Sequence, residues 1–388
     1  MNRERALGSL AVMLALALPW NEALSAQTAE KAWTIDVPLG KSPTLRVENV
    51  LGSVEIRGSS DRTRARVEIQ VLAEAKTAEE AARLAGAVVV DSASGEAKPG
   101  VLVFLPPDVA SVRLPREGKN PVTRWVGSLF HRSADVEVAG GGRPVRIVTD
   151  RKAPGLAVRL VVAVPYDARV SVRQGVGSIR VEAARGTFSL ENRDGRVDVS
   201  SVFGSVAIDA AASDVGVTLF QGADLHVRTT TGSVELLEVR CRNVRIQTTT
   251  GGVLGSALAA DEASVTTGTG NVKLTGLEPR TAEIRTDQGA VDLAVRIAGM
   301  RKAVIDSAAG DVVLRVSHGL SFDLLARTPS GEVKTLGMSL DAVDKEGNVS
   351  RLRHGGGGPS FDVTAGRTLT VRPYDASRFD ILVGEVGR

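Results

Sequence analysis

The stretch "VRTTTGSVEL" at residues 227–236 is followed by three close copies of itself: "IQTTTGGVLG" (246–255), "VTTGTGNVKL" (265–274) and "IRTDQGAVDL" (284–293). Each copy begins 19 residues after the previous one. A fixed period near 20 residues is typical of a solenoid, in which every repeat forms one winding of a coil. The repeat therefore predicts the fold of most of the chain.

One glycine recurs in every copy and sets the register of the repeat. The aligned glycines are Gly232, Gly251, Gly270, Gly289, Gly310 and Gly331. The same signature surrounds Gly52, Gly177, Gly195 and Gly204 at less regular spacing. Glycine adopts positive φ without a steric penalty, so we expect these glycines to form a tight corner between two short strands.

Apolar and polar residues alternate on both sides of the glycine. Two residues after it stand Val234, Val253, Val272, Val291, Val312 and Val333, and five before it stand Val227, Ile246, Val265, Ile284, Ile305 and Ala326. A period of two indicates strands with one buried face. The sequence thus predicts an all-β, single-stranded β-solenoid, or β-helix, whose narrow coil is filled by aliphatic side chains and has no interior pocket.

A column of hydroxyl side chains lies three residues before the glycine. Its members are Thr229, Thr248, Thr267, Thr286, Ser307 and Thr328. Their parity matches the inward aliphatics, so they are expected to be buried and to need hydrogen-bond partners. We expect them to bond one another or the turn backbone from rung to rung. A flat outward array that orders water or ice is disfavoured by this parity.

Composition agrees with a tightly wound aliphatic stack. The 388 residues are 43% apolar but only 3% aromatic, and 41 of them are glycine. The 48 basic and 45 acidic residues are interspersed, which indicates a solvated surface and not a nucleic-acid-binding stripe. The single cysteine, Cys241, excludes an intrachain disulfide framework.

Residues 1–26 are predicted to be a signal peptide. Arg3 and Arg5 give a basic start, residues 6–19 form an apolar run, and "ALSA" (23–26) offers a cleavage site. The apolar run is shorter than the roughly 20 residues of a membrane span, and a buried helix is the alternative. We expect an exported protein of the periplasm or cell surface, with no transmembrane domain beyond this segment. An uncleaved signal would tether it.

The remaining chain divides into three expected parts. Residues 27–165 hold N-terminal strands, a short capping helix at about 77–88 and an irregular insertion at 107–155. The helix is marked by "TAEEAARLAG", with Thr77 as its N-cap. Solenoid rungs follow from 166 to 371, and 372–388 form a C-terminal cap or tail. The insertion, which contains Trp125, Phe130 and His131, is expected to be mobile.

The sequence contains few motifs that are typical of catalytic or metal-binding sites. The histidines (His131, His226, His318 and His354) lack metal-ligand spacing. "HGGGG" (354–358) has no nucleophile elbow to serve, and "NRDGRVD" (192–198) is an Asp-Gly turn rather than a calcium loop. No catalytic, cofactor-binding or metal site is predicted. The candidates for an acidic catalytic face are Asp287, Asp292, Asp306 and Asp311, with Lys273 and Arg285.

Taken together, these motifs resemble the DUF4097 family of adhesin-like bacterial repeat proteins. The resemblance rests on "VENVLGSVEIRG", the helix "AEEAARLAG", "LVVAVPYDARVSVRQGVGSIRV", the T-x-x-G-x-V-x-L rungs and "GGGGPSFDVTAGRTLTV". It implies a right-handed β-solenoid outside the cytoplasm, without an established activity or agreed ligand residues. Residues 107–155 depart from the family pattern.

We therefore expect an exported, non-enzymatic adhesin-like binding or scaffold protein of the cell envelope. Its partner would be an envelope polymer, a surface protein or another copy of itself. The alternative is a polysaccharide lyase or hydrolase that uses the acidic outer face. An outer-membrane barrel also fits the alternation, but the few aromatic residues and the Gly-Arg terminus disfavour it.

Overall fold

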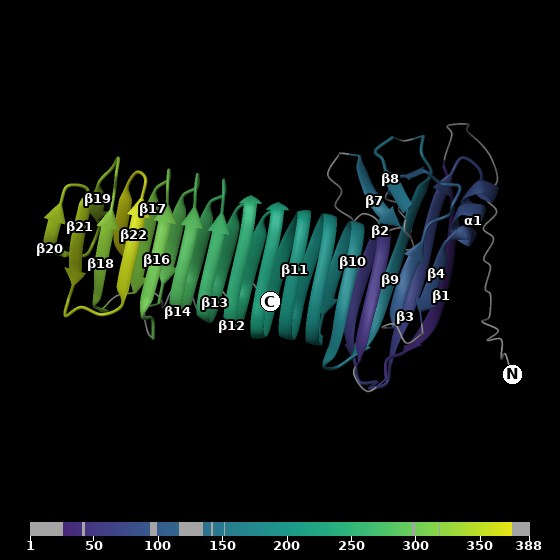
Figure 1. Cartoon of the computed structure of the whole chain (residues 1–388), viewed down its shortest axis with the longest axis horizontal. Coiled ribbons are helices and arrows are strands. Elements are labelled where there is room, and N and C mark those ends of the chain that lie inside the picture. The colour runs from purple at the N-terminus through teal and green to yellow at the C-terminus, as the bar shows by residue number, and fades with distance from the viewer. Residues whose placement is uncertain are drawn as a thin grey trace.

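The computed structural model describes residues 26–40, 43–93, 99–115, 135–140, 143–150, 152–296, 299–317 and 319–374. It is an elongated coil whose strands run across the long axis and stack along it (Figure 1). The elements are β1 (Gln27–Pro38), β2 (Thr44–Ser59), β3 (Arg64–Ala75), α1 (Ala78–Ala87), β4 (Val89–Ala93), β5 (Gly100–Phe104), β6 (Ser111–Val112), β7 (Val136–Gly140), β8 (Arg143–Ile147), β9 (Gly155–Pro165), β10 (Ala168–Glu182), β11 (Arg185–Thr231), β12 (Val234–Thr250), β13 (Val253–Thr267), β14 (Val272–Thr286), β15 (Val291–Val295), β16 (Lys302–Ser307), β17 (Val312–Ser317), β18 (Phe322–Arg327), β19 (Val333–Thr335), β20 (Asp341–Glu346), β21 (Val349–His354), β22 (Ser360–Ala365) and β23 (Leu369–Tyr374). The predicted β-solenoid is confirmed.

The middle of the coil follows the sequence repeat. β11, β12, β13 and β14 pair in parallel, with each winding in register with the next. Val234, Val253, Val272 and Val291 occupy one column and are at most 2% exposed. The predicted internal columns are therefore present, and one apolar cluster runs through the whole coil.

The corner glycines are required for a different reason from the one predicted. Gly232, Gly251, Gly270, Gly289 and Gly310 are not among the residues with positive φ. A Cβ at any of them would instead lie between 1.8 and 2.1 Å from the carbonyl oxygen of the corner residue one rung earlier. Adjacent rungs thus approach too closely at this corner for a side chain. Positive φ does occur at the earlier corners Gly52, Gly177 and Gly195, at 129–132°. Gly204 also has positive φ, at 133°, but it stacks on Gly186 and therefore lies in a different column from the one expected.

A second bend in each winding carries positive φ on residues other than glycine. Ala183, Ser201, Leu219, Glu238 and Ala257 have φ of 48–55°, and Gly276 continues the column at 63°. A left-handed conformation costs an L-residue with a Cβ roughly 1–2 kcal/mol. Five successive rungs therefore carry strain at this bend, and only the sixth relieves it with glycine.

Ala257→Gly is accordingly expected to raise the free energy of unfolding, by up to about 1 kcal/mol, because relief of the left-handed strain exceeds the entropy lost by glycine. Ala259→Gly, on the same strand but without positive φ, is expected to lower it by about 0.5–1 kcal/mol. Urea unfolding followed by circular dichroism measures both. Equal losses for the two variants would contradict the strain argument.

The N-terminal end of the coil is threaded out of sequence order. β9 and β10 are consecutive in the chain, yet β2 lies between them and pairs in parallel with both. On the far side of β9, β3 and then β1 continue the sheet in antiparallel pairing. β5 pairs in parallel with the first part of β2, from Arg46 to Glu48, whereas β9 pairs with the part that begins at Gly52. β2 is thus enclosed by β9 and β10, two strands that lie about a hundred residues or more after it in the sequence.

The C-terminal end is threaded in the same manner. The β22–β23 rung pairs with β16–β17 on one side and with β18–β19 on the other. The expectation that Gly331 would stack on Gly310 is therefore wrong: a Cβ at Gly331 would meet the carbonyl oxygen of Arg367 at 1.9 Å. The stack ends in the antiparallel β20–β21 hairpin, which follows β18. Residues 375–388 of the expected C-terminal part lie outside the described residues.

The capping helix is present at the N-terminal end. α1 begins after Thr77, whose hydroxyl accepts a hydrogen bond from the Glu80 amide at 3.2 Å. Its Ala81, Leu84 and Ala85 are buried against the apolar cluster, beside β1 and β3 (Figure 1). Within the described residues, the structure has no helix with the length and apolar character needed to cross a bilayer.

The insertion is more regular than predicted in its described part. β6, β8 and β7 form a separate three-stranded sheet beside the coil. Trp125, Phe130 and His131 lie outside the described residues. The sheet is anchored by Arg113, whose guanidinium forms a buried ion pair with the Glu74 carboxylate of β3 at 2.7 Å. Arg113 also donates to the carbonyls of Ala153 and Leu114.

Candidate functional site

The hydroxyl column lies inside the coil and bonds the corner backbone. Thr229, Thr248, Thr267 and Thr286 are at most 6% exposed. Each hydroxyl donates to the carbonyl of the corner residue of the previous rung; the acceptors are Ser213, Gly232, Gly251 and Gly270, at 3.1–3.5 Å. Ser307 continues the column by donating to Gly289 at 2.8 Å. The same carbonyls are the ones that exclude a Cβ at the corner glycines.

Three amide side chains continue this column toward the N-terminus, and the sequence reasoning missed them. Asn49, Gln174 and Asn192 are in register with one another and are at most 4% exposed. Gln174 donates to the Gly52 carbonyl at 3.3 Å, and Asn192 donates to the Gly177 carbonyl at 3.2 Å. Each stands three residues before Gly52, Gly177 or Gly195, so the spacing could have revealed them.

Thr267→Val is expected to lower the free energy of unfolding by about 1–2 kcal/mol, because it leaves the buried Gly251 carbonyl without this donor. Thr266→Val, one residue earlier on the exposed face, is the control and should change it by less than about 0.5 kcal/mol. Denaturant unfolding of both variants measures the difference. A Thr267→Val variant as stable as its control would show that the hydroxyl column contributes nothing.

The acidic residues considered for catalysis do not converge. Asp292 on β15 forms an ion pair with Arg315. Asp306 lies on another strand, β16, where it is paired in register with Arg285 of β14. Asp311 accepts a hydrogen bond from the Thr368 amide at 2.9 Å. Within the described ranges, no group of three His, Cys, Asp or Glu residues has the arrangement of a metal site.

The remaining sequence motifs also have structural roles. "HGGGG" forms the turn between β21 and β22, where Nδ1 of His354 lies 2.7 Å from the Ser339 carbonyl. "NRDGRVD" lies within β11 and includes the corner Gly195. The pKa of His226 is lowered by partial burial and by Arg245 and Arg228. His318 lies outside the described residues.

Cys241 is half-buried, and its thiol donates to the Asn243 carbonyl at 3.5 Å. Burial, followed by the negative charge of Asp224, raises its pKa to about 12. Because the thiolate is the reactive form, iodoacetamide at pH 8 should alkylate Cys241 about 10- to 100-fold more slowly in the folded protein than in urea. Mass spectrometry of timed samples measures both rates, and equal rates would contradict this environment.

A groove of about 540 Å³ lies on the outside of the coil, where β2, β10 and β11 meet β5 and β7. Its apolar lining comes from Val50, Val103, Val138 and Ala211. Gly175 allows the insertion to lie this close, because a Cβ there would be 2.6 Å from Cγ1 of Val138. The groove is therefore formed jointly by the coil and by the insertion that departs from the repeat.

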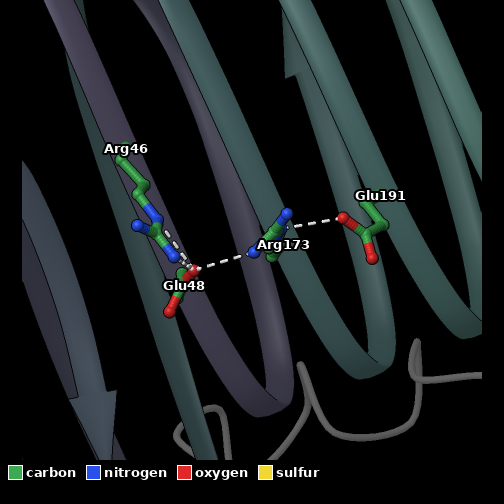
Figure 2. Close-up of polar contacts among 4 residues, drawn as sticks. All are labelled: Arg46, Glu48, Arg173 and Glu191. Carbon is green, nitrogen blue, oxygen red and sulfur yellow. Dashed lines mark hydrogen bonds and ion pairs between the residues drawn. The ribbon is translucent and has the colours of Figure 1, made fainter. Parts of the chain in front are cut away.

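A ladder of alternating charges runs along this groove (Figure 2). Glu48, Arg173 and Glu191 occupy one column on three adjacent rungs. Arg173 Nη1 lies 3.7 Å from the Glu48 carboxylate, and Arg173 Nε lies 2.8 Å from that of Glu191. Arg46 also pairs with Glu48 from the same strand. The two cations and two carboxylates of this ladder therefore neutralise one another.

Two further charged side chains lining the groove are exposed. Asp209 follows Glu191 on the next winding, and Arg193 lies beside Asn192. Among the described residues, Arg193 has no ion-pair partner. The groove thus offers an unpaired guanidinium, an exposed carboxylate and an apolar wall.

A coil of parallel windings in register, filled by aliphatic columns, defines a β-solenoid protein. The family model described as Toastrack DUF4097 matches residues 153–356, more than half of the chain. The chain belongs to this family, which confirms the resemblance seen in its motifs. Comparison with curated proteins gives no match.

Two solved structures are similar to the chain. The first is named "putative cell adhesion protein", from Clostridium sporogenes ATCC 15579; it is 7% identical, the match covers 89% of this chain and 100% of that one, and the TM-score is 0.16. The second is named "putative adhesin (BF0245)", from Bacteroides fragilis NCTC 9343; it is 10% identical, with 89% and 97% covered and a TM-score of 0.29. Such low scores give no information about what this chain binds.

Proposed function

We propose that this chain is an exported, non-enzymatic protein that binds a polymer of the bacterial cell envelope in an adhesin-like or scaffolding role. In this proposal residues 1–26 direct export, residues 27–371 form the body that binds the polymer, and the residues after β23, which ends at Tyr374, act as a tail. The protein would work in the periplasm or at the cell surface. The observation that carries the proposal is the groove between the insertion and the coil.

The proposal is supported by the position of the charged side chains of the groove, which lie on the outside of the coil. The interior of the coil is packed with apolar side chains and with a column of hydroxyl groups that donate to backbone carbonyls. A ligand must therefore bind outside the coil. The groove is lined by Arg46, Arg173 and Arg193 together with Glu48, Glu191 and Asp209. A lining with both signs of charge complements a polymer that carries both carboxylates and amines, as the peptide stems of peptidoglycan do.

The test is cosedimentation of the purified protein with isolated peptidoglycan sacculi. Arg193→Glu is expected to weaken binding at least 10-fold, because it reverses the unpaired cation of the groove. Arg240→Glu is the matched control: Arg240 is also exposed, has no ion-pair partner among the described residues, and lies outside the groove lining. Removal of the whole insertion is a poorer test, since it would also remove the buried Arg113.

Two results would overturn the proposal. One is binding to sacculi that the two variants weaken equally, or no binding at all. The other is turnover of uronate or acetylated polysaccharides that is lost in Asp287→Asn or Asp292→Asn, which would favour the enzyme alternative.

A further inference from the structure

The two ends of the strand stack are protected very differently. The C-terminal end is β20, which has six residues, four of them charged, and a bulge between Ala342 and Asp344. The N-terminal end is β1, which has twelve residues, only three of them charged, and pairs with β3 along its whole length without a register shift. Charges and bulges are the usual devices that stop a strand edge from pairing with another chain. β20 carries both, whereas β1 has no bulge and a lower density of charge.

The outer edge of β1 has no strand partner among the described residues. Its inner face is only partly covered: Ala29, Trp33 and Ile35 pack against the apolar cluster but remain half-buried. The ammonium of Lys31 lies 4.7 Å from the centroid of the Trp33 ring. A further strand beside β1 would cover these side chains and satisfy the open row of backbone groups.

We propose that the occupant of this edge is β1 of a second copy, antiparallel about a twofold axis through Ala32. The proposal goes beyond the proposed envelope function and does not depend on it. The facing pairs are Ala32 with Ala32, Lys31 with Trp33, Glu30 with Thr34, Ala29 with Ile35 and Thr28 with Asp36. No like charges face each other, and each Lys31 ammonium faces the aromatic ring of the other copy.

The neighbouring registers that also pair most of β1 are worse. An axis through Lys31 places two ammonium groups opposite each other, and an axis through Trp33 places Glu30 opposite Asp36. Like charges directly opposite each other destabilise a strand pair. An axis through Thr34 avoids this but leaves the first residues of β1 unpaired and sets Lys31 against Val37. Charge complementarity therefore selects the register centred on Ala32.

In this arrangement the β9–β3–β1 sheet continues into the sheet of the second copy. A twofold axis perpendicular to the sheet keeps both α1 helices on the same side of it. Two coils joined at their N-terminal ends form one rod of about twice the length, with the charged β20 hairpins at its two tips. Such a dimer closes the only long regular edge seen in the described part of the chain, and β20 prevents further growth.

The register gives a sharp cross-linking test. Residues directly opposite in an antiparallel pair have Cα atoms about 4.5–5.5 Å apart, within the span of a disulfide. In a Cys241→Ser background, Ala32→Cys should form an intermolecular disulfide under mild oxidation, seen as a dimer on a non-reducing gel. Thr34→Cys is the matched control: Thr34 is exposed on the same strand but faces Glu30 of the other copy, and it should cross-link at least 10-fold less.

A second variant pair tests the association without a covalent bond. Ala32→Glu places two carboxylates face to face and should raise the dimer dissociation constant at least 10-fold in sedimentation velocity, whereas Ala32→Thr should retain the dimer. Ala32 is exposed, so the circular dichroism and melting of both variants should match those of the parent. A parent protein that sediments as a monomer at about 100 μM, or equal cross-linking at positions 32 and 34, would overturn the proposal. A monomer whose β1 pairs with a different protein would do the same.

Discussion

Gly251→Ala is expected to lower the free energy of unfolding by about 3 kcal/mol or more, one of the largest effects available to a single methyl group in this chain. A Cβ at this position would lie 2.0 Å from the Gly232 carbonyl oxygen and 3.0 Å from the hydroxyl of Thr248. Neither neighbour can retreat, because the carbonyl belongs to the packed backbone of the preceding rung and the hydroxyl donates to it. The variant must therefore separate the two rungs locally.

The adjacent residue is the control for this prediction. A Cβ at Gly252 would meet nothing closer than the Asn271 carbonyl oxygen at 3.4 Å, and Gly252 does not have positive φ. Gly252→Ala should therefore change the unfolding free energy by less than about 0.5 kcal/mol. Urea unfolding followed by circular dichroism compares the two variants. Similar midpoints would mean that the close approach of rungs at the corner is not required for stability.

Arg113→Met is expected to lower the free energy of unfolding by about 3–5 kcal/mol. The Arg113 and Glu74 side chains are 9% and 4% exposed, so the substitution removes the cation that neutralises a carboxylate deep in the protein. It also removes the hydrogen bonds that Arg113 donates to the carbonyls of Leu114 and Ala153, which join the beginning and the end of the insertion. Urea unfolding measures the loss, and limited proteolysis should show earlier cleavage between 107 and 155.

Two comparisons separate the buried charge from the general loss of an arginine. Arg83→Met breaks the ion pair with Asp108, whose partners are both about half exposed, and should cost less than about 1 kcal/mol. The double variant Arg113→Met with Glu74→Leu replaces the pair by apolar groups and should recover much of the loss. A double variant no more stable than Arg113→Met would indicate that the hydrogen bonds within the insertion dominate, and not the loss of the cation beside Glu74.

The coil could be predicted from the sequence because the pattern that specifies it lies within each short repeat. Alternation around each glycine repeats every 19 residues, and the stacked positions of Val234, Val253 and Val272 follow from that period alone. The sequence did not predict that the corner glycines serve close approach rather than positive φ. Both requirements select glycine, and only the distance between rungs separates them.

The order of the rungs was also beyond the sequence. β2 and β22–β23 have the same alternation as every other rung, so nothing in their residues states which neighbours they pair with. The groove was missed for the same reason, since it joins β2, β10 and β7 from distant parts of the chain. The amide column could have been found, because Asn49, Gln174 and Asn192 keep the spacing of the threonines.

Because strands at the two ends of the coil pair out of sequence order, the ends can fold only in a restricted order. A chain that emerges N-terminus first presents β2 long before β9 and β10, its neighbours on both sides, have been made. The β22–β23 rung emerges after both of the rungs that enclose it. The central windings can form while the chain is still emerging. The N-terminal end can form only after β9 and β10 have emerged, and the C-terminal end only after β22 and β23 have emerged. The coil can therefore be complete only after the chain has emerged at least as far as residue 374.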